Sequence, residues 1–229
     1  MSKARIIEAV RTLDLPTTKE LLKAKPSLHG VTDRQGRNLA HLACSASCAK
    51  LRVPEAAAAR LVTFLLDLGM DIEATVGRDR CTPLFFAVAS GRSPTLVRLL
   101  IRRGARPARA PGGGLFAAGW WDDVENLHLL LRAGAKIDVV VGVTPFLACW
   151  CWRRFEAAKF LALRGANVNF QDAKGRTALR HGVEKEYAPS MLQWLVRHGA
   201  SADIPDDEGV SPRLRASRKR DKRFLAALS

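Results

Sequence analysis

Five glycine residues recur at nearly constant intervals through the middle of this 229-residue chain. Gly69, Gly104, Gly134, Gly165 and Gly199 are separated by 35, 30, 31 and 34 residues. Each follows a short apolar segment, such as LVRLLIRR before Gly104, and a left-handed glycine is a common helix terminator. Periods of this size are typical of repeat architectures, in which each unit buries its apolar face only against its neighbours. The sequence therefore predicts a repeat array.

A second motif marks the start of an earlier helix in the units. The segments TPLF at 82–85, TPFL at 144–147 and TALR at 177–180 align, with NLAH at 38–41 upstream and SPRL at 211–214 downstream. Each begins with a small polar residue that can cap a helix N-terminus, and in three of them proline occupies the next position, where its missing N–H costs nothing. Each unit is therefore predicted to contain two helices.

These motifs resemble those of the ankyrin-repeat family. The T-P-L-x starts, AHLA at 40–43, GANVN at 165–169 and DAKGRT at 172–177 carry the resemblance, which covers roughly residues 33–217. It implies an all-α solenoid of helix–turn–helix units with short β-turn fingers and about five recognisable repeats between caps. The expected divisions are an N-terminal capping helix pair at 1–32, repeats within 33–210 (33–75, 76–110, 111–140, 141–171 and 172–205) and a basic C-terminal cap at 211–229.

The stretch PGGGLFAAGWW at 111–121 falls at the start of the third repeat. No Lys-Ser/Thr follows its glycines, so it is not a phosphate-binding loop, and the helical pattern resumes too soon for a linker. Because the helix cap and the proline are both missing, we expect this repeat to be the least stable one. The fingers entering the third and fourth repeats are shortened, and the first repeat carries an insertion at 45–54, expected to be a surface loop.

The ankyrin resemblance also implies where a partner would bind. Partners of this family usually occupy a concave groove, and the most variable contact positions are the two residues after the apolar run of the inner helix. Transferred to this sequence, those positions are Ser45 and Ala46, Ala89 and Ser90, Trp120 and Trp121, Cys151 and Trp152, Glu184 and Lys185.

Tryptophan dominates two of these adjacent pairs. Trp120, Trp121 and Trp152 are therefore candidate partner-binding residues, with Val140 and Val141 of the intervening finger as added apolar surface. The alternative is that they are covered, by the loop of the first repeat or by a second copy of the chain. Two further tryptophans are expected in the core: Trp194, and Trp150, which would fill the space left by Gly119.

The net charge of +15 gathers in two clusters, Arg80–Arg109 and Arg213–Arg223. Candidate contacts to an acidic partner surface are Arg78, Arg80, Arg106 and Lys185, with solvated surface as the alternative. Nucleic acid or another polyanion is a secondary candidate partner for the second cluster, which could equally be a solubilising cap. Its basic residues are Arg213, Arg215, Arg218, Lys219, Arg220, Lys222 and Arg223.

Catalytic signals are weak. The five histidines and five cysteines form no catalytic or metal-binding pattern, so we expect no enzyme activity, no cofactor and no metal. The odd number of cysteines favours a reducing interior, hence an intracellular, cytoplasmic protein, with the nucleus or delivery into another cell left open. No segment has the length of a membrane helix. The sequence predicts a monomeric scaffold or adaptor that binds a protein, with a polyanion-binding protein or a regulatory subunit of an enzyme complex as alternatives.

Overall fold

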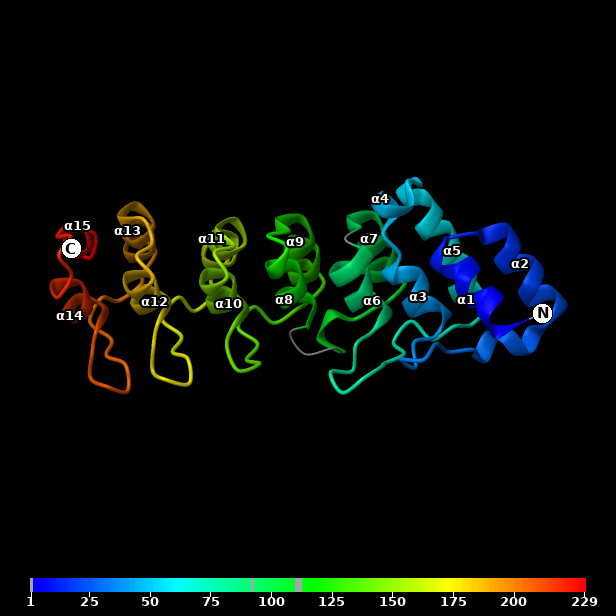
Figure 1. The fold of residues 1–229 in the computed structure, drawn as a ribbon, viewed down its shortest axis with the longest axis horizontal. Coiled ribbons are helices and arrows are strands. Elements are labelled where there is room, and N and C mark those ends of the chain that lie inside the picture. Colours follow the sequence, from blue (N-terminus) through cyan, green and yellow to red (C-terminus); the bar gives the residue numbers. More distant parts are fainter. Residues whose placement is uncertain (1, 92, 110–112) are drawn as a thin grey trace. The chain divides into compact units, whose positions relative to one another are not determined.

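The computed structural model describes residues 2–91, 93–109 and 113–229 (Figure 1). Pro111 and Gly112 of the glycine-rich stretch lie outside the described residues, as does the side chain of Arg109. The chain forms two compact units, the first comprising Met1–Ala118 and Glu125–Ala135, the second Gly119–Val124 and Lys136–Ser229. In the described residues, β structure is limited to isolated bridges in three fingers, such as Val141 with Val143. The expected all-α class is confirmed.

The first unit is built from antiparallel helix pairs. α1 packs on α2 and on α3, and α3 packs in turn on α5 and α6, so that each pair is buried against the next. A π-helical segment, η2, continues α6 directly. The elements are α1 (Lys3–Arg11), α2 (Leu15–Ala24), η1 (Pro26–Gly30), α3 (Leu39–Ser45), α4 (Cys48–Leu51), α5 (Glu55–Asp67), α6 (Pro83–Phe86), η2 (Ala87–Gly91), α7 (Pro94–Arg102), η3 (Pro107–Arg109), α8 (Gly113–Trp120) and α9 (Val124–Arg132). The last two residues of α8 and the first residue of α9 belong to the second unit.

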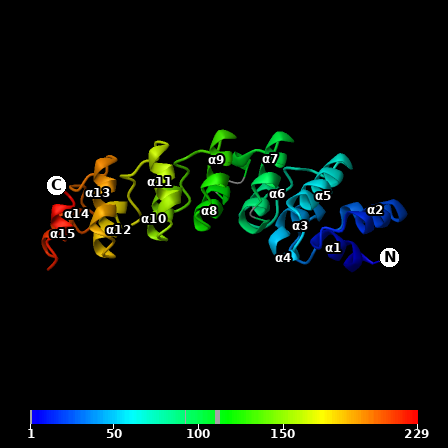
Figure 2. The same ribbon diagram turned by 90° about the horizontal axis from the view of Figure 1, so that it is seen from above.

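The second unit repeats the same plan. The inner helices α10 and α12 lie in one row and the outer helices α11 and α13 in another (Figure 2). Loops preceding α12 and α14 project away from the helices as fingers (Figure 1). The helices are α10 (Pro145–Cys151), α11 (Phe155–Leu163), α12 (Ala178–Glu184), α13 (Pro189–Arg197), α14 (Pro212–Ser217) and α15 (Arg223–Ala226).

Small polar residues cap the inner helices, as the start motif predicts. The side chains of Thr82, Thr144, Thr177 and Ser211 each accept a hydrogen bond from the backbone N–H three residues later. Asn38 does the same for α3. Each such cap is worth about 1 kcal/mol, so the positions of the helix starts are encoded locally.

The recurring glycines end the outer helices in the left-handed conformation, with φ angles between +86° at Gly69 and +94° at Gly104. His41 is buried, and its Nε2–H donates to the backbone carbonyls of Ala74 (3.0 Å) and Cys81 (3.2 Å). Its contacts tie α3 to the following finger. The predicted glycine stops are therefore confirmed, and His41 has a structural role.

The glycines at the start of α8 have a steric role as well. A Cβ atom on Gly113 would lie 3.1 Å from the Phe85 ring, and one on Gly114 would lie 3.3 Å from Leu130. A Cβ atom at either position would make a tight contact with a neighbouring side chain, while the low stability expected of this repeat stays a prediction. The insertion at 45–54 forms the single-turn helix α4, which buries Cys48.

Candidate functional site

Three tryptophans lie at the ends of two inner helices, all within the second unit. Trp120 ends α8 and Trp121 follows it, and each side chain is 47% exposed. Trp152 is the C-cap of α10 and is half-buried. The rings of Trp120 and Trp152 meet edge to face, with centroids 5.1 Å apart and planes at 79°. We call Trp120, Trp121 and Trp152 the tryptophan patch.

Neighbouring polar residues fix the position of this patch. The guanidinium of Arg154 lies over the Trp120 ring, 5.6 Å from its centroid, in cation–π geometry. Asp122 adopts a left-handed φ of +57°, and its carboxylate accepts a 2.7 Å hydrogen bond from the backbone N–H of Ala157 in the first turn of α11. Because Arg154, the N-cap of α11, makes no side-chain capping bond, Asp122 caps that helix from the preceding repeat. The turn that follows Trp121 is therefore held against α11 by the Asp122 side chain.

Val140 and Val141 form a separate apolar spot. Their side chains are 58% and 55% exposed, and they lie in the finger before α10. Trp152 lies at the other end of this helix, whose seven residues, Pro145–Cys151, span about 10 Å. The valines are exposed as the sequence predicts, but a ligand would have to extend along α10 to contact both them and Trp152.

Trp150 is structural, although not in the way the sequence predicts. It is fully buried, and its ring contacts Phe155 and Tyr187. The space beside Gly119 is filled by the sulfur of Cys149, so the expectation that Trp150 fills it is wrong. The Trp150 ring lies instead against Gly182 of the next repeat. A Cβ atom on Gly182 would be 3.4 Å from the ring.

Trp194 corrects a second expectation. It is half-buried, and its ring stacks on that of His198, the C-cap of α13, with centroids 3.9 Å apart. The sequence predicted a core position for this residue.

Glu184 and Lys185 occupy the groove positions of the next inner helix, α12, and both are engaged. The Glu184 carboxylate lies 3.1 Å from Arg180, 3.9 Å from Arg176 and 4.0 Å from Arg215. We call these four residues the Glu184 cluster.

Arg180 of this cluster and Lys185 each have a further partner. Arg180, only 5% exposed, also pairs with the buried Asp206 at 3.0 Å. The ammonium of Lys185 donates to the carbonyl of Cys151 at 3.3 Å, so this candidate binding residue also caps α10.

The three finger arginines of the first unit differ in their surroundings. Arg78 and Arg80 are exposed on either side of Asp79, and Arg80 has a left-handed φ of +51°. Arg106 is exposed but lies beside Glu73, with Nε 3.7 Å from the carboxylate. Arg98 on α7 pairs with Glu125, and Arg103, the C-cap of α7, pairs with Asp67. The arginine-rich segment is therefore partly neutralised within its own unit.

The C-terminal basic residues also divide into paired and unpaired groups. Arg213 binds Asp203 (2.7 Å), Lys219 binds Glu186 (2.6 Å), and Arg223 binds Asp221 (2.8 Å). Arg215 belongs to the Glu184 cluster. In the described part of the chain, Arg218, Arg220 and Lys222 are exposed and make no ion pair, so the candidate polyanion surface narrows to these three.

No thiol is activated as a nucleophile. Burial raises the pKa of Cys149 to about 12 and also raises the pKa of Cys44 and of Cys151, so the thiolate forms are scarce at neutral pH. Among the described residues, no group of His, Cys, Asp and Glu is arranged to hold a metal ion. No helix in the described ranges has the length and apolar character needed to cross a membrane.

Several contact residues were missed by the sequence reasoning. Asp122, Arg153 and Glu186 immediately follow the pairs of groove positions, and all have left-handed φ angles between +53° and +60°. The side chain of each contacts the next repeat along the chain. Asp122 bonds to the Ala157 N–H, Arg153 lies over the Tyr187 ring, and Glu186 bonds to Lys219. Their equivalent positions, each directly after a pair of groove positions, were the sequence signal that could have identified them.

Comparisons with known proteins point to one fold. The ankyrin repeat protein L91 of Acanthamoeba polyphaga mimivirus is 29% identical over 159 residues, which cover 63% of this chain and 21% of that protein. ZDHHC13 of Danio rerio, whose name describes a palmitoyltransferase, is 28% identical over 157 residues, covering 66% of this chain and 24% of that protein. This chain thus spans less than a quarter of the length of either relative.

A solved structure agrees with these matches. The ankyrin repeat domain of Bcl-3, described as a member of the IkappaB protein family, has a TM-score of 0.78 and 24% identity, covering 98% of this chain and 97% of that domain. No protein-family model matches the sequence. Domains of this fold generally serve as protein-binding modules, and the likeness shows the fold without naming a partner.

Proposed function

Since this chain is an array of ankyrin repeats, we propose that it is a non-catalytic protein-binding module whose partner is anchored on the tryptophan patch. The observation that carries this proposal is the 47% exposure of both Trp120 and Trp121, beside the half-buried ring of Trp152. Exposed clusters of large apolar side chains are uncommon on a protein surface that binds nothing. Tryptophan is also the residue type most enriched among interface residues that dominate affinity.

The charges around the patch support an acidic partner surface. Arg154 lies over Trp120, and Arg153 lies exposed next to Trp152, with its guanidinium 4.8 Å from the Tyr187 ring centroid. A partner segment that places apolar side chains on the tryptophans and carboxylates at its edge would satisfy both features. Such a rim of charges affects the rate and specificity of association more than the affinity.

The proposal is tested by capture of partners from lysates with the wild-type chain and with the Trp120→Ala/Trp152→Ala variant, followed by mass spectrometry. A matched control is Leu163→Ala/Trp194→Ala, which removes two partly exposed apolar side chains of α11 and α13 in the same unit. Proteins retained by the wild type and the control but lost by the patch variant support the proposal. Equal retention by all three chains contradicts it.

Polyanion binding is a second candidate, favoured by the unpaired Arg218, Arg220 and Lys222. Binding of nucleic acid through these residues would weaken steeply with salt, because it releases condensed counterions. The test is a fluorescence-anisotropy titration with double-stranded DNA at several salt concentrations, with Arg218→Ala/Arg220→Ala/Lys222→Ala as the variant. Weak binding that the variant leaves unchanged rejects this candidate.

We also infer an intracellular site of action. The five cysteines are all free, and Cys44, Cys48 and Cys149 are buried, so none contributes a disulfide to stability. A chain of this kind suits a reducing compartment. Fractionation of cells that contain the native protein tests the inference.

A further inference from the structure

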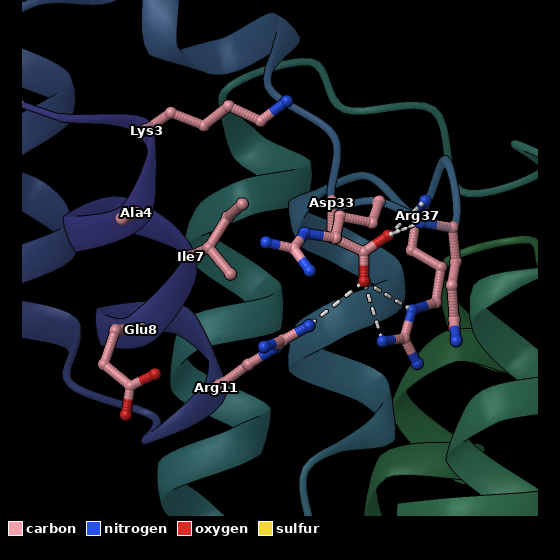
Figure 3. A pocket seen from close by; sticks show the side chains of 9 residues that line it. Lys3, Ala4, Ile7, Glu8, Arg11, Asp33 and Arg37 are labelled. Atoms are coloured by element: carbon pink, nitrogen blue, oxygen red, sulfur yellow. Dashed lines mark hydrogen bonds and ion pairs between the residues drawn. The ribbon is translucent and has the colours of Figure 1, made fainter.

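A cleft of about 680 Å³ lies in the first unit, apart from the tryptophan patch (Figure 3). One side is α1 and the other is the finger that precedes α3. This volume is within the range of about 300–1,000 Å³ typical of ligand-binding clefts. The lining residues are Lys3, Ala4, Ile7, Glu8 and Arg11 from α1, and Asp33, Arg34, Gln35 and Arg37 from the finger.

The buried carboxylate of Asp33 is fully committed to neighbours within the cleft. One oxygen accepts hydrogen bonds from the backbone N–H groups of Gln35 (2.9 Å) and Arg37 (3.0 Å). The other accepts from the guanidinium groups of Arg37 (2.7 Å) and Arg11 (3.1 Å), as Figure 3 shows. The single negative charge of Asp33 therefore has no capacity left for other cations of the cleft.

The cleft consequently has an excess of positive charge. Its lining has four basic residues and two acidic ones. Lys3 and Arg34 are exposed, and neither makes an ion pair with any residue that the structure describes. Glu8 is exposed and is the one acid of the lining that is not already bonded to arginine. An anionic ligand would gain attraction from Lys3 and Arg34 and be opposed by Glu8.

The floor of the cleft is apolar. Ala4 and Ile7 lie one helical turn apart on α1, and the Ile7 side chain is directed into the cleft between Lys3 and Arg11 (Figure 3). An inorganic ion would fill only a small part of 680 Å³ and would leave this floor in water. An Asp- or Glu-bearing peptide offers both carboxylates and aliphatic surface.

We propose that this cleft binds an acidic peptide segment, with its carboxylates at Lys3 and Arg34 and its aliphatic atoms on Ala4 and Ile7. This second docking site is independent of the tryptophan patch. The module would thereby hold an acidic segment at its first helix pair, whether or not the patch is occupied.

The test is a fluorescence-anisotropy titration of the full chain with a short labelled peptide of alternating Glu and Ala, at low salt. Lys3→Ala/Arg34→Ala is expected to weaken binding about tenfold, since each exposed ion pair contributes modestly and two are lost. The control Lys23→Ala/Lys25→Ala removes the same charge from exposed positions on the same unit and is expected to change affinity less than about twofold. Glu8→Gln is expected to strengthen binding about twofold.

Two further arms identify the ligand class. In the wild-type chain, peptide addition should shift the NMR signal of the Ile7 methyl groups, whereas inorganic phosphate at the same ionic strength should not displace the peptide. A Gln-for-Glu peptide should not bind. The proposal is overturned if both double variants lose affinity equally, if phosphate competes and leaves Ile7 unchanged, or if the Glu peptide does not bind at all.

Discussion

The tryptophan patch lies at the ends of α8 and α10, and Glu184 occupies the equivalent place at the end of α12, yet the two surfaces are opposite in character. In the patch, Trp120 and Trp121 are each 47% exposed. In the cluster, Glu184 is surrounded by three arginines, and Lys185 is bonded to the end of α10. The same backbone position can therefore either leave apolar surface open or satisfy its own charges. Burial by another protein is favoured by the hydrophobic effect only for the tryptophan patch, because its exposed surface is apolar.

The largest contrast in stability should separate Trp150 from Trp152, which lie two residues apart on α10. Trp150→Ala empties a fully buried site and should lower the free energy of unfolding by about 3–5 kcal/mol. Trp152→Ala removes a half-buried ring and should cost about 1 kcal/mol. Urea denaturation followed by circular dichroism measures both values. Equal losses would mean that the patch is part of the core.

Breaking the Glu184 cluster should also reduce stability without affecting partner binding. Arg180→Ala leaves the buried Asp206 without its counter-charge, which should cost about 3 kcal/mol. Thermal unfolding and partner capture with the same protein sample separate the two effects. If the folded variant lost its partners as Trp120→Ala/Trp152→Ala is expected to, the cluster would also belong to the binding surface.

The stability of the fold should depend on pH most strongly through Asp172, which bonds to Arg176 of the Glu184 cluster. Burial opposes ionisation of Asp172, but hydrogen bonds from Arg176 and His181 hold the pKa of its carboxyl well below the usual range. Its contribution to stability is therefore present above about pH 3.9, the unfolded value, and is lost as the pH falls through the lower folded value. Asp172→Asn should cost about 1–2 kcal/mol at pH 7, and this difference should shrink only below about pH 4. A constant difference down to pH 2 would contradict the assignment.

The smallest effects should come from the turn beside the patch. Asp122→Ala removes the cap of α11 and should cost about 1 kcal/mol. Asp122→Gly removes the same cap but relieves the left-handed backbone, so it should cost about 0.5 kcal/mol less. Chemical denaturation of the two variants compares them. If glycine were the more harmful substitution, strain at this turn would have no energetic role.

Local signals explain what could be predicted from the sequence. Thr82 and Thr144 specify helix starts, and the recurring glycines specify helix ends, through bonds that reach no further than one turn. The repetition then predicts the packing, because each helix pair buries its apolar face against a neighbouring pair of similar structure. The same alignment placed Trp120 and Trp121 at groove positions and left open whether they were covered, and the structure shows both exposed.

Contacts between distant residues could not be read in this way. Lys219 and Glu186 are bonded although 33 residues apart, and nothing in either segment predicts that pairing. Trp150 and Cys149 are adjacent but point in directions about 100° apart around α10, and the repeat motif does not tell which of them meets Gly119. The cleft beside Ile7 arises where α1 and a finger meet, so it has no motif of its own.

Site-specific photo-crosslinking tests the central claim most directly. A photoreactive phenylalanine analogue placed at Trp121, and separately at Glu184, reports which surface touches a partner in intact cells. Trp121 directly follows α8, Glu184 ends α12, and both residues are exposed and belong to the second unit. The account predicts a crosslinked partner from position 121 and none from position 184. Crosslinking from 184 alone, or from neither position, would contradict it.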